Sequence, residues 1–215
     1  MAESVTERKA ERCSGSLNTI RNGVPLRQRS PDVPAARGEF AGPPRPPRAM
    51  LTGVLIREAT AADWPAIWPF FRAIVAAGET YTYPRDMDEP TSREMWMLAP
   101  PSRTVVAVDG AGTVLGSAKM NANHMGAAAH IASASFMVDP AHGGRGVGRA
   151  LGEYAVDWAR TTGFRAMQFN AVVETNTRAV ALWQSLGFEI MTTLPEGFLH
   201  PTKGYVGLHI MYRRL

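Results

Sequence analysis

One segment of the chain, residues 142–149, has the composition of an anion-binding loop. It reads His-Gly-Gly-Arg-Gly-Val-Gly-Arg, with four glycines among six consecutive residues. Glycines let a backbone approach a ligand closely, and the first N–H groups of a helix lack internal partners and attract anions. Because a strand-like run precedes this segment and a helical pattern follows it, we expect a phosphate cradle here. A tight turn with glycines for packing alone is the alternative.

Two widespread phosphate-binding loops do not fit this segment. The P-loop pattern G-x-x-x-x-G-K-[ST] requires a Gly-Lys pair, and the chain contains none. The dinucleotide pattern G-x-G-x-x-G fails because Arg149 or Leu151 stands where the third glycine belongs. The sequence therefore indicates a different phosphate-bearing ligand.

Covalent and metal-dependent chemistry have no support in the residue pattern. The single cysteine, Cys13, allows no intrachain disulfide and no thiolate-rich metal site. No G-x-S-x-G elbow occurs, so acyl transfer through a serine is not expected. The five histidines lack metal-ligand spacing, since the pair His124 and His130 lies six residues apart in a predicted loop. We expect no metal site.

Strand-like and helix-like patterns alternate from residue 51 onward and must position the loop. A capping box, Thr60 to Asp63, predicts a helix that ends at Gly78 and that Pro69 bends or splits. Thr91 or Ser92 is expected to cap a second helix through residue 98, and two further helices are predicted at 146–162 and 176–186. Strands are predicted at 54–56, 104–108, 113–118, 131–138, 166–173, 188–193 and 205–212, with a loop at 121–130.

This order of elements predicts an α/β (α+β) fold. Short links join the early strands as hairpins, whereas a helix connects the strand at 131–138 to the strand at 166–173. Such a helical crossover makes the two strands parallel. The expected sheet is therefore mixed, mostly antiparallel with one parallel pair, and flanked by helices.

The basic character of the chain belongs to its first fifty residues. Residues 1–50 carry nine Lys or Arg and five acids, whereas residues 51–215 carry 14 of each sign. Seven of the sixteen prolines also fall in residues 1–50, which we interpret as a disordered Arg/Pro-rich tail before a domain at 51–215. A basic arm that binds nucleic acid, and translation that starts at Met50, are the alternatives. No run approaches the roughly 18 apolar residues of a membrane span.

A second motif follows the glycine loop at a fixed separation. Residues 176–188 read N-T-R-A-V-A-L-W-Q-S-L-G-F. Together the two segments resemble the GNAT superfamily of acetyl-CoA-dependent N-acetyltransferases, with its (R/Q)-x-x-G-x-(G/A) loop and its N-x-x-A-x-x-L-Y-x-x-x-G-F helix. The resemblance spans residues 130–190, and the predicted order of elements agrees with that fold.

The resemblance implies how acetyl-CoA is held. The end of the strand at 131–138 would offer main-chain groups to the pantetheine arm, the glycine loop would hold the pyrophosphate, and an asparagine would hydrogen-bond the coenzyme. A backbone N–H on that strand would polarise the acetyl carbonyl. The implied cofactor-binding residues are Phe136, Met137, Val138, Gly143, Gly144, Arg145, Gly146, Val147, Gly148 and Asn176.

Two positions depart from the family pattern. Gly143 stands where Arg or Gln is usual, so Arg145, His142 or Arg149 is expected to replace the missing phosphate contact. Trp183 stands where many members carry a tyrosine that protonates the leaving thiolate. An indole N–H has no useful acidity in water, so we interpret Trp183 as a core residue.

Candidate catalytic residues lie outside the two motifs. Attack by an amine requires loss of a proton, and a carboxylate is the usual base. Glu79, in a polar and aromatic loop, is the first candidate for that base, and Glu174 is the second. Asn170 precedes Asn176 by six residues, a spacing similar to that of proline-analogue N-acetyltransferases, which implies that Asn170 orients the substrate. The tyrosines of the same loop, at 81 and 83, either wall the acceptor pocket or simply pack.

The predicted function is transfer of the acetyl group of acetyl-CoA to the amine of a small molecule or amino acid. We expect a cytoplasmic enzyme with a small-molecule partner, no membrane and no nucleic acid, and the resemblance allows a homodimer through the last strands. A non-catalytic acetyl-CoA-binding module and a protein N-acetyltransferase are the alternatives.

Overall fold

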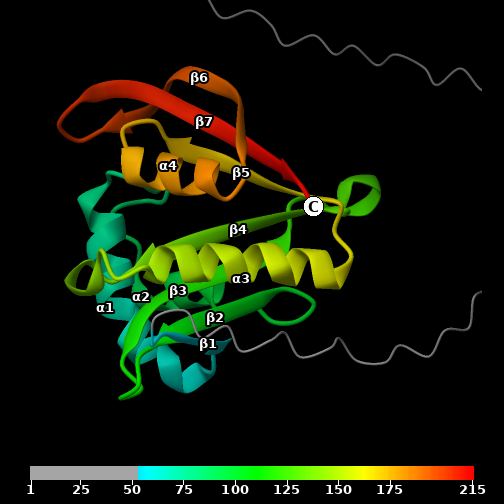
Figure 1. The fold of residues 1–215 in the computed structure, drawn as a ribbon. Coiled ribbons are helices and arrows are strands. Elements are labelled where there is room, and N and C mark those ends of the chain that lie inside the picture. The colour runs from blue at the N-terminus through cyan, green and yellow to red at the C-terminus, as the bar shows by residue number, and fades with distance from the viewer. Residues whose placement is uncertain (1–52) are drawn as a thin grey trace, which may run out of the picture. The chain divides into compact units, whose positions relative to one another are not determined.

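A computed structural model describes residues 53–215, and the predictions about residues 1–50 and Met50 lie outside this part of the chain. The helices and strands follow one another as shown in Figure 1. The strands are β1 (Leu55–Glu58), β2 (Arg103–Val108), β3 (Val114–Ala122), β4 (Ile131–Val138), β5 (Ala166–Val173), β6 (Glu189–His200) and β7 (Gly204–Arg214). The helices are α1 (Trp64–Ala77), α2 (Glu89–Trp96), α3 (Val147–Thr162) and α4 (Thr177–Ser185), with short 3-10 turns at Ala61–Asp63, Gly126–Ala128 and Pro140–His142.

Seven strands form one sheet in the order β1-β2-β3-β4-β5-β7-β6. Every neighbouring pair is antiparallel except β4 and β5, which confirms the predicted parallel pair. The β4–β5 pairing covers only Ile131 with Ala166 and Ala132 with Met167. Beyond these two registers the strands separate, so the middle of the sheet opens into a V.

The two faces of the sheet bury separate cores. On one face, α3 and α4 pack with side chains such as Leu151, Phe169 and Trp183. On the other face, α1 and α2 bury Ile67, Phe71 and Trp96. Met137 of β4 joins the α1–α2 core while its neighbour Phe136 packs against the α3–α4 core, as alternation along a strand requires.

The first two helices differ from their predicted form. Pro69 does not split α1, which is assigned as one helix with Pro65 in its first turn and Gly78 in the left-handed conformation after its end. Pro69 has no N–H to donate to the carbonyl four residues earlier, so α1 lacks one hydrogen bond near its start. The burial of the apolar face of α1 keeps the helix continuous despite this loss. The cap of α2 is Asp88 rather than Thr91 or Ser92, because the Asp88 carboxylate accepts from the Thr91 N–H at 2.8 Å.

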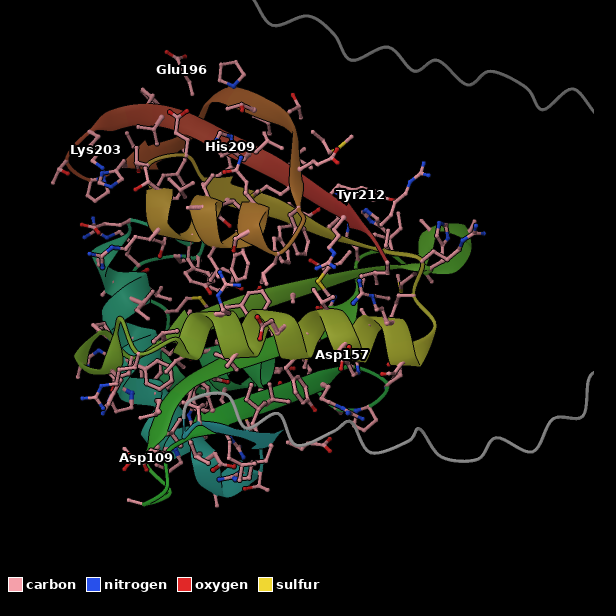
Figure 2. All side chains as sticks on the ribbon, in the orientation of Figure 1. Asp109, Asp157, Glu196, Lys203, His209 and Tyr212 are labelled. Carbon is pink, nitrogen blue, oxygen red and sulfur yellow. The ribbon has the colours of Figure 1, made fainter. Side chains whose placement is uncertain are left out.

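Three strands extend past their predicted ends. β3 continues to Ala122, so the expected loop at 121–130 is shorter, and β6 and β7 reach His200 and Arg214. An irregularity between Leu194 and Phe198 lets β6 continue past Pro195. Glu196 in this irregularity has φ 54° and points away from the sheet, whereas His209 lies along β7 (Figure 2).

Within residues 53–215, no helix combines the length and apolarity that crossing a membrane requires. The same residues contain no cluster of three or more His, Cys, Asp or Glu side chains arranged to hold a metal ion.

Candidate active site

A cleft of about 370 Å³ lies where β4 and β5 separate. Its walls come from both strands, from the loop after α1, and from the start of α4. The lining residues are Ile74, Thr80, Tyr81, Thr82, Tyr83, Ser133, Ala134, Ser135, Phe136, Met137, Val138, Phe169, Asn170, Ala171, Val172, Val173, Asn176, Ala179 and Trp183. The cleft therefore brings together five predicted site residues from β4, β5 and the start of α4: Phe136, Met137, Val138, Asn170 and Asn176.

Beyond its short pairing with β5, the edge of β4 that faces the cleft carries backbone N–H groups that bond to no neighbouring strand. The hydrogen bonds from the Asp139 N–H to the Leu115 carbonyl, and from the Asn123 N–H to the Ile131 carbonyl, fix which β4 residues bond to β3. Because hydrogen bonding alternates along an antiparallel pair, the even-numbered residues of β4, Phe136 and Val138 among them, direct their N–H and C=O groups toward the opening. These N–H groups can donate to a carbonyl or amide held in the cleft.

The glycine loop lies between the 3-10 turn after β4 and the first turn of α3. Gly144 and Gly146 have φ of 80° and 78°, which only glycine adopts without strain. Gly146 is the residue before α3, and the N–H groups of Gly144, Arg145 and Gly146 have no backbone acceptor within the described residues. With the open first turn of α3 they form a row of donors suited to a phosphate.

Of the basic side chains expected to replace the missing contact at Gly143, only Arg145 is unengaged in the described part of the chain. His142 faces Asp139, with its Nδ1 3.3 Å from the carboxylate. Arg149 donates to the Ser185 hydroxyl at 2.8 Å and lies 3.5 Å from the Glu153 carboxylate. Arg145 is exposed and has neither kind of partner, so it is free to reach an anion at the loop.

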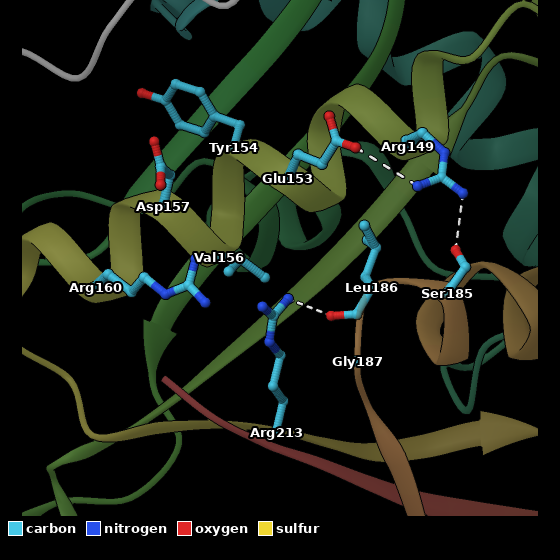
Figure 3. Close-up of a pocket in the computed structure, with 10 residues that line it drawn as sticks. All are labelled: Arg149, Glu153, Tyr154, Val156, Asp157, Arg160, Ser185, Leu186, Gly187 and Arg213. Atoms are coloured by element: carbon cyan, nitrogen blue, oxygen red, sulfur yellow. Dashed lines mark hydrogen bonds and ion pairs between the residues drawn. The ribbon is translucent and has the colours of Figure 1, made fainter.

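Arg149 lines a second, larger cavity of about 650 Å³ between α3 and the end of α4 (Figure 3). Arg213 of β7 enters this cavity and donates to the Leu186 carbonyl, at the end of α4. Burial lowers the pKa of Arg213, and the positive charge of Arg160 lowers it further. Apart from Arg149, this cavity contains none of the residues predicted to bind the cofactor or to act in catalysis, so its larger volume does not identify it as the active site.

Asn176 begins α4 and serves as its cap. Its side-chain oxygen accepts from the Ala179 N–H at 3.3 Å, which satisfies a first-turn donor. The side-chain NH₂ group has no partner within the described residues and belongs to a residue that lines the cleft. Asn176 can therefore cap the helix and donate to a ligand at the same time.

Trp183 joins the two arms of the V from the α4 side. Its ring lies 4.6 Å from that of Phe136 on β4 and 5.0 Å from that of Phe169 on β5, measured between centroids. The side chain is 7% exposed and belongs to the α3–α4 core. This placement confirms the interpretation of Trp183 as a core residue.

The opposite side of the cleft is aromatic and polar. Tyr81 donates from its hydroxyl to the Phe136 carbonyl at 2.6 Å, so it contacts the free edge of β4. Burial raises the pKa of Tyr81 well above its ordinary value, and this hydroxyl remains a neutral donor. Lys119 of β3 lies over the rings of Tyr83 and Trp96 and donates to the Met95 carbonyl at 3.0 Å. Burial lowers the pKa of Lys119, and no carboxylate of the described residues pairs with it.

Asn170 belongs to a network of side-chain amides. Its Oδ1 accepts from Gln168 Nε2 at 2.7 Å and from Asn123 Nδ2 at 3.3 Å, while its Nδ2 donates to Asn123 Oδ1 at 2.6 Å. The β5–β7 register shifts between Phe169 and Val172, so Asn170 and the following residue form a bulge. Bulges redirect side chains and are frequent beside active sites.

The predicted bases are placed differently from each other. Glu79 is exposed and precedes Thr80, which lines the cleft, although Glu79 itself does not. Glu174 accepts from the Gly207 N–H of β7 through its carboxylate, which occupies one oxygen in holding the strands together. The catalytic role of either carboxylate stays a prediction.

Sequence patterns missed several contacts of the site. Nothing local in the sequence indicated that Tyr81 would reach the Phe136 carbonyl, 55 residues later, or that Asn123 would pair with Asn170, 47 residues later. The polar residues Ser133 and Ser135 within an apolar strand were the available signal, because a buried strand face has no need of hydroxyls.

Comparison with known proteins identifies the family of this chain. The sequence model of the acetyltransferase (GNAT) family matches residues 67–188. A solved GCN5-related N-acetyltransferase from Kribbella flavida is 61% identical, with a TM-score of 0.74 over 76% of this chain and 98% of that one. A phosphinothricin acetyltransferase from Sinorhizobium meliloti, solved in complex with AcCoA, is 25% identical, with a TM-score of 0.70 over 76% of this chain and 89% of that one.

A curated relative, the N-acetyltransferase aca1 of Schizosaccharomyces pombe, is 31% identical over 111 residues. That match covers 51% of this chain and about half, 53%, of the relative. The mixed sheet with one parallel pair is the acyl-CoA N-acyltransferase fold of these structures. The chain therefore belongs to the acetyltransferase (GNAT) family, whose members are enzymes of the acyltransferase class that use acetyl-CoA as co-substrate.

Proposed function

We propose that this protein transfers the acetyl group of acetyl-CoA to the amine of a small molecule or amino acid. The observation that carries the proposal is the cleft between β4 and β5, which has free N–H groups along one wall and the donor row of the glycine loop at the start of α3. Bound acetyl-CoA supplies an activated acetyl group, a thioester. The other requirements of the reaction fall to side chains and backbone groups of this chain.

Each proposed role follows from a donor or an acceptor in the cleft. The N–H groups of Gly144 to Gly148 hold the pyrophosphate, and the Asn176 NH₂ group binds the pantetheine arm. A free N–H of β4, at Phe136 or Val138, donates to the acetyl carbonyl oxygen and stabilises the charge that develops as the amine attacks. Trp183 packs beneath this region and moves no proton.

We assign the removal of the amine proton to Glu79, acting through water. Glu79 is one residue from the cleft wall at Thr80, and none of the side chains that line the cleft within the described residues is acidic. A base outside the wall, reached through one or two waters, is consistent with both observations. A small-molecule partner, the cytoplasm and a homodimer remain predictions.

The small-molecule assignment draws on the dimensions of the site. A cleft of about 370 Å³ is at the lower end of ligand pockets and suits an acceptor of amino-acid size beside the acetyl end of the coenzyme. The similar Sinorhizobium protein is named for phosphinothricin, which is an acceptor of this size. A protein acceptor and a non-catalytic module are the competing functions.

The test measures release of free CoA thiol with a panel of amines: amino acids, phosphinothricin-like acids, proline analogues, polyamines and peptides. We expect turnover of at least one small acceptor and a loss of about tenfold or more in kcat for Glu79→Gln. Glu94→Gln, an exposed acid on α2, is the matched control and retains full activity. Binding of acetyl-CoA without turnover of any amine refutes the enzyme and favours the binding module.

A further inference from the structure

The cavity of about 650 Å³ between α3 and the end of α4 is separate from the proposed active site. It is lined by one face of α3, by residues 185–187 and by Arg213 of β7, and it shares no lining residue with the cleft. A helix rises 1.5 Å per residue, which places Arg160 about 20 Å along α3 from Gly146 and the glycine loop. The volume of the cavity is within the range of small-molecule pockets.

The charged side chains of this cavity do not all pair with one another. Five of them line it: Arg149, Glu153, Asp157, Arg160 and Arg213. Arg149 and Glu153 lie 3.5 Å apart and offset each other. Neither Arg160 nor Arg213 forms an ion pair within the described residues. Asp157 precedes Arg160 by three residues, but Figure 3 shows its carboxylate turned away from both guanidinium groups. The cavity therefore keeps two uncompensated positive charges.

These two charges converge on one part of the cavity. The guanidinium groups of Arg160, from α3, and Arg213, from β7, point toward each other in Figure 3. Burial lowers the pKa of Arg213, and the nearby positive charge of Arg160 lowers it further. Two like charges at close range repel each other, and an anion held between them turns this repulsion into two attractions.

The Arg213 guanidinium is held in place by contacts of the protein itself. Its Nη1 donates to the Leu186 carbonyl at the end of α4. Gly187 has φ 82°, and a Cβ at this position would lie 3.5 Å from Arg213 Nε, so the glycine leaves room for the guanidinium. A guanidinium carries five N–H donors, and the contact with Leu186 uses one. The remaining donors suffice for paired hydrogen bonds to a carboxylate or phosphate.

We propose that this cavity binds a small dianion and that Arg160 and Arg213 hold its oxygen atoms from two sides. The suitable ligands carry a phosphate monoester or two neighbouring carboxylates, attached to an apolar part that packs against Val156 and Leu186 of the cavity wall. This site is independent of the proposed function, because no residue of the cleft takes part in it.

The test titrates the full-length protein by calorimetry with phenyl phosphate and with phthalate, which represent the two kinds of dianion. Saturating CoA is present so that the glycine loop is occupied. We expect one molecule of at least one probe to bind per chain, whereas benzamide, an uncharged molecule of similar size, does not bind. Arg160→Gln should weaken the affinity about tenfold. Arg72→Gln, an exposed arginine of α1, is the matched control for net charge and keeps the affinity.

Two further variants separate the charge from the fold. Arg213→Gln should also weaken binding about tenfold, but it removes the contact with Leu186 as well. Arg160→Glu leaves that contact in place, and it should abolish binding because it sets a negative charge beside the ligand. Arg160 is exposed, so its replacements are expected to fold, and thermal melting of each variant checks this.

Each outcome bears on the site alone. Absence of saturable binding by both probes overturns it. Equal affinities of the wild type and Arg160→Gln also overturn it, because the anion then binds elsewhere, for example at the arginines of residues 1–50. Wild-type binding that occurs only without CoA assigns the anion to the glycine loop and overturns the second site. Failure of acetyl transfer with every amine overturns the proposed function and leaves this site untouched.

Discussion

The two sides of the cleft are built from different parts of the polypeptide. The side proposed to bind the coenzyme consists of backbone: unpaired N–H groups on β4 and the glycine loop at the start of α3. The side proposed to bind the acceptor consists of side chains: Tyr81 from the loop after α1, and the amides of Asn123 and Asn170. In the proposed arrangement, a backbone surface binds the coenzyme, which is common to the reactions of the family, whereas a side-chain surface can change with the acceptor.

The two sides of the cleft should also differ in which substitutions they tolerate. The coenzyme side depends on the presence of glycine and on the register of the strands, so a new side chain damages it by adding atoms. The acceptor side depends on particular polar atoms, so a truncated side chain damages it by removing them. Substitutions that add atoms to one side and remove them from the other test this difference directly.

The largest effect on stability is expected at Trp183, which packs against both β4 and β5. Trp183→Ala should lower the free energy of unfolding by about 3–5 kcal/mol, because a buried ring that contacts both arms of the V is lost. Trp183→Phe should lose less than half of this and keep its kcat. Urea unfolding and steady-state kinetics measure both. A stable Trp183→Phe protein without turnover would show that the indole takes part in the chemistry.

The next effect tests the backbone side by adding atoms. Gly146→Val should raise the KM for acetyl-CoA at least tenfold and cost about 1–2 kcal/mol of stability, because a branched side chain is strained at φ 78°. Gly112→Val, at φ 86° in the turn between β2 and β3, is the matched control. It should lose similar stability with an unchanged KM. Equal kinetic effects in both variants would contradict a binding role for the loop.

The ion pair between Arg57 and Asp63, just before α1, should make the free energy of unfolding depend on pH. Arg57 hydrogen-bonds Asp63 at 2.6 Å and 2.8 Å just before α1, the helix that leads to Tyr81, and holds the Asp63 pKa at about 2. A lowered folded-state pKa contributes stability above the unfolded value near 4, and this stability is lost as the pH falls to about 2. Unfolding free energies at pH 5 and pH 2.5 should differ by about 1.5 kcal/mol more in the wild type than in Asp63→Asn. If the wild type and Asp63→Asn lose the same stability between pH 5 and pH 2.5, the ion pair is not formed in solution.

The smallest effect concerns Asn176, whose side chain is proposed to bind the coenzyme. Asn176→Ala should cost about 1 kcal/mol through loss of the α4 cap. A rise in the KM for acetyl-CoA of a few fold should accompany it, whereas Asn176→Asp should keep the stability and lose the affinity, because a carboxylate caps but does not donate. Thermal melting and coenzyme titration separate the two effects. An Asn176→Asp variant with wild-type affinity would confine the residue to capping.

The coenzyme side could be predicted from sequence because its determinants are local. The glycine spacing before an amphipathic pattern identified the loop, the start of α3 and the parallel pair of strands. The acceptor side depends on contacts such as Asn123 with Asn170, which no local pattern encodes. The cap of α2 was assigned to Thr91 or Ser92 because both are good capping residues, although Asp88 lies earlier and precedes Pro90 in the first turn.

The bulge at Asn170 has a consequence for insertions and deletions. Before it, Met167 and Phe169 face the α3–α4 core; after it, Val172 faces that core and Val173 packs on the other side with the β6–β7 hairpin. The extra residue thus switches the buried positions of β5 from odd to even numbers. Deleting Ala171 restores simple alternation and keeps Phe169 and Val172 on the same face of the sheet, so the core survives while the bulge at Asn170 is lost. Homologues that are one residue shorter at this point should therefore keep one parity of apolar positions along the whole strand, which an alignment can read directly.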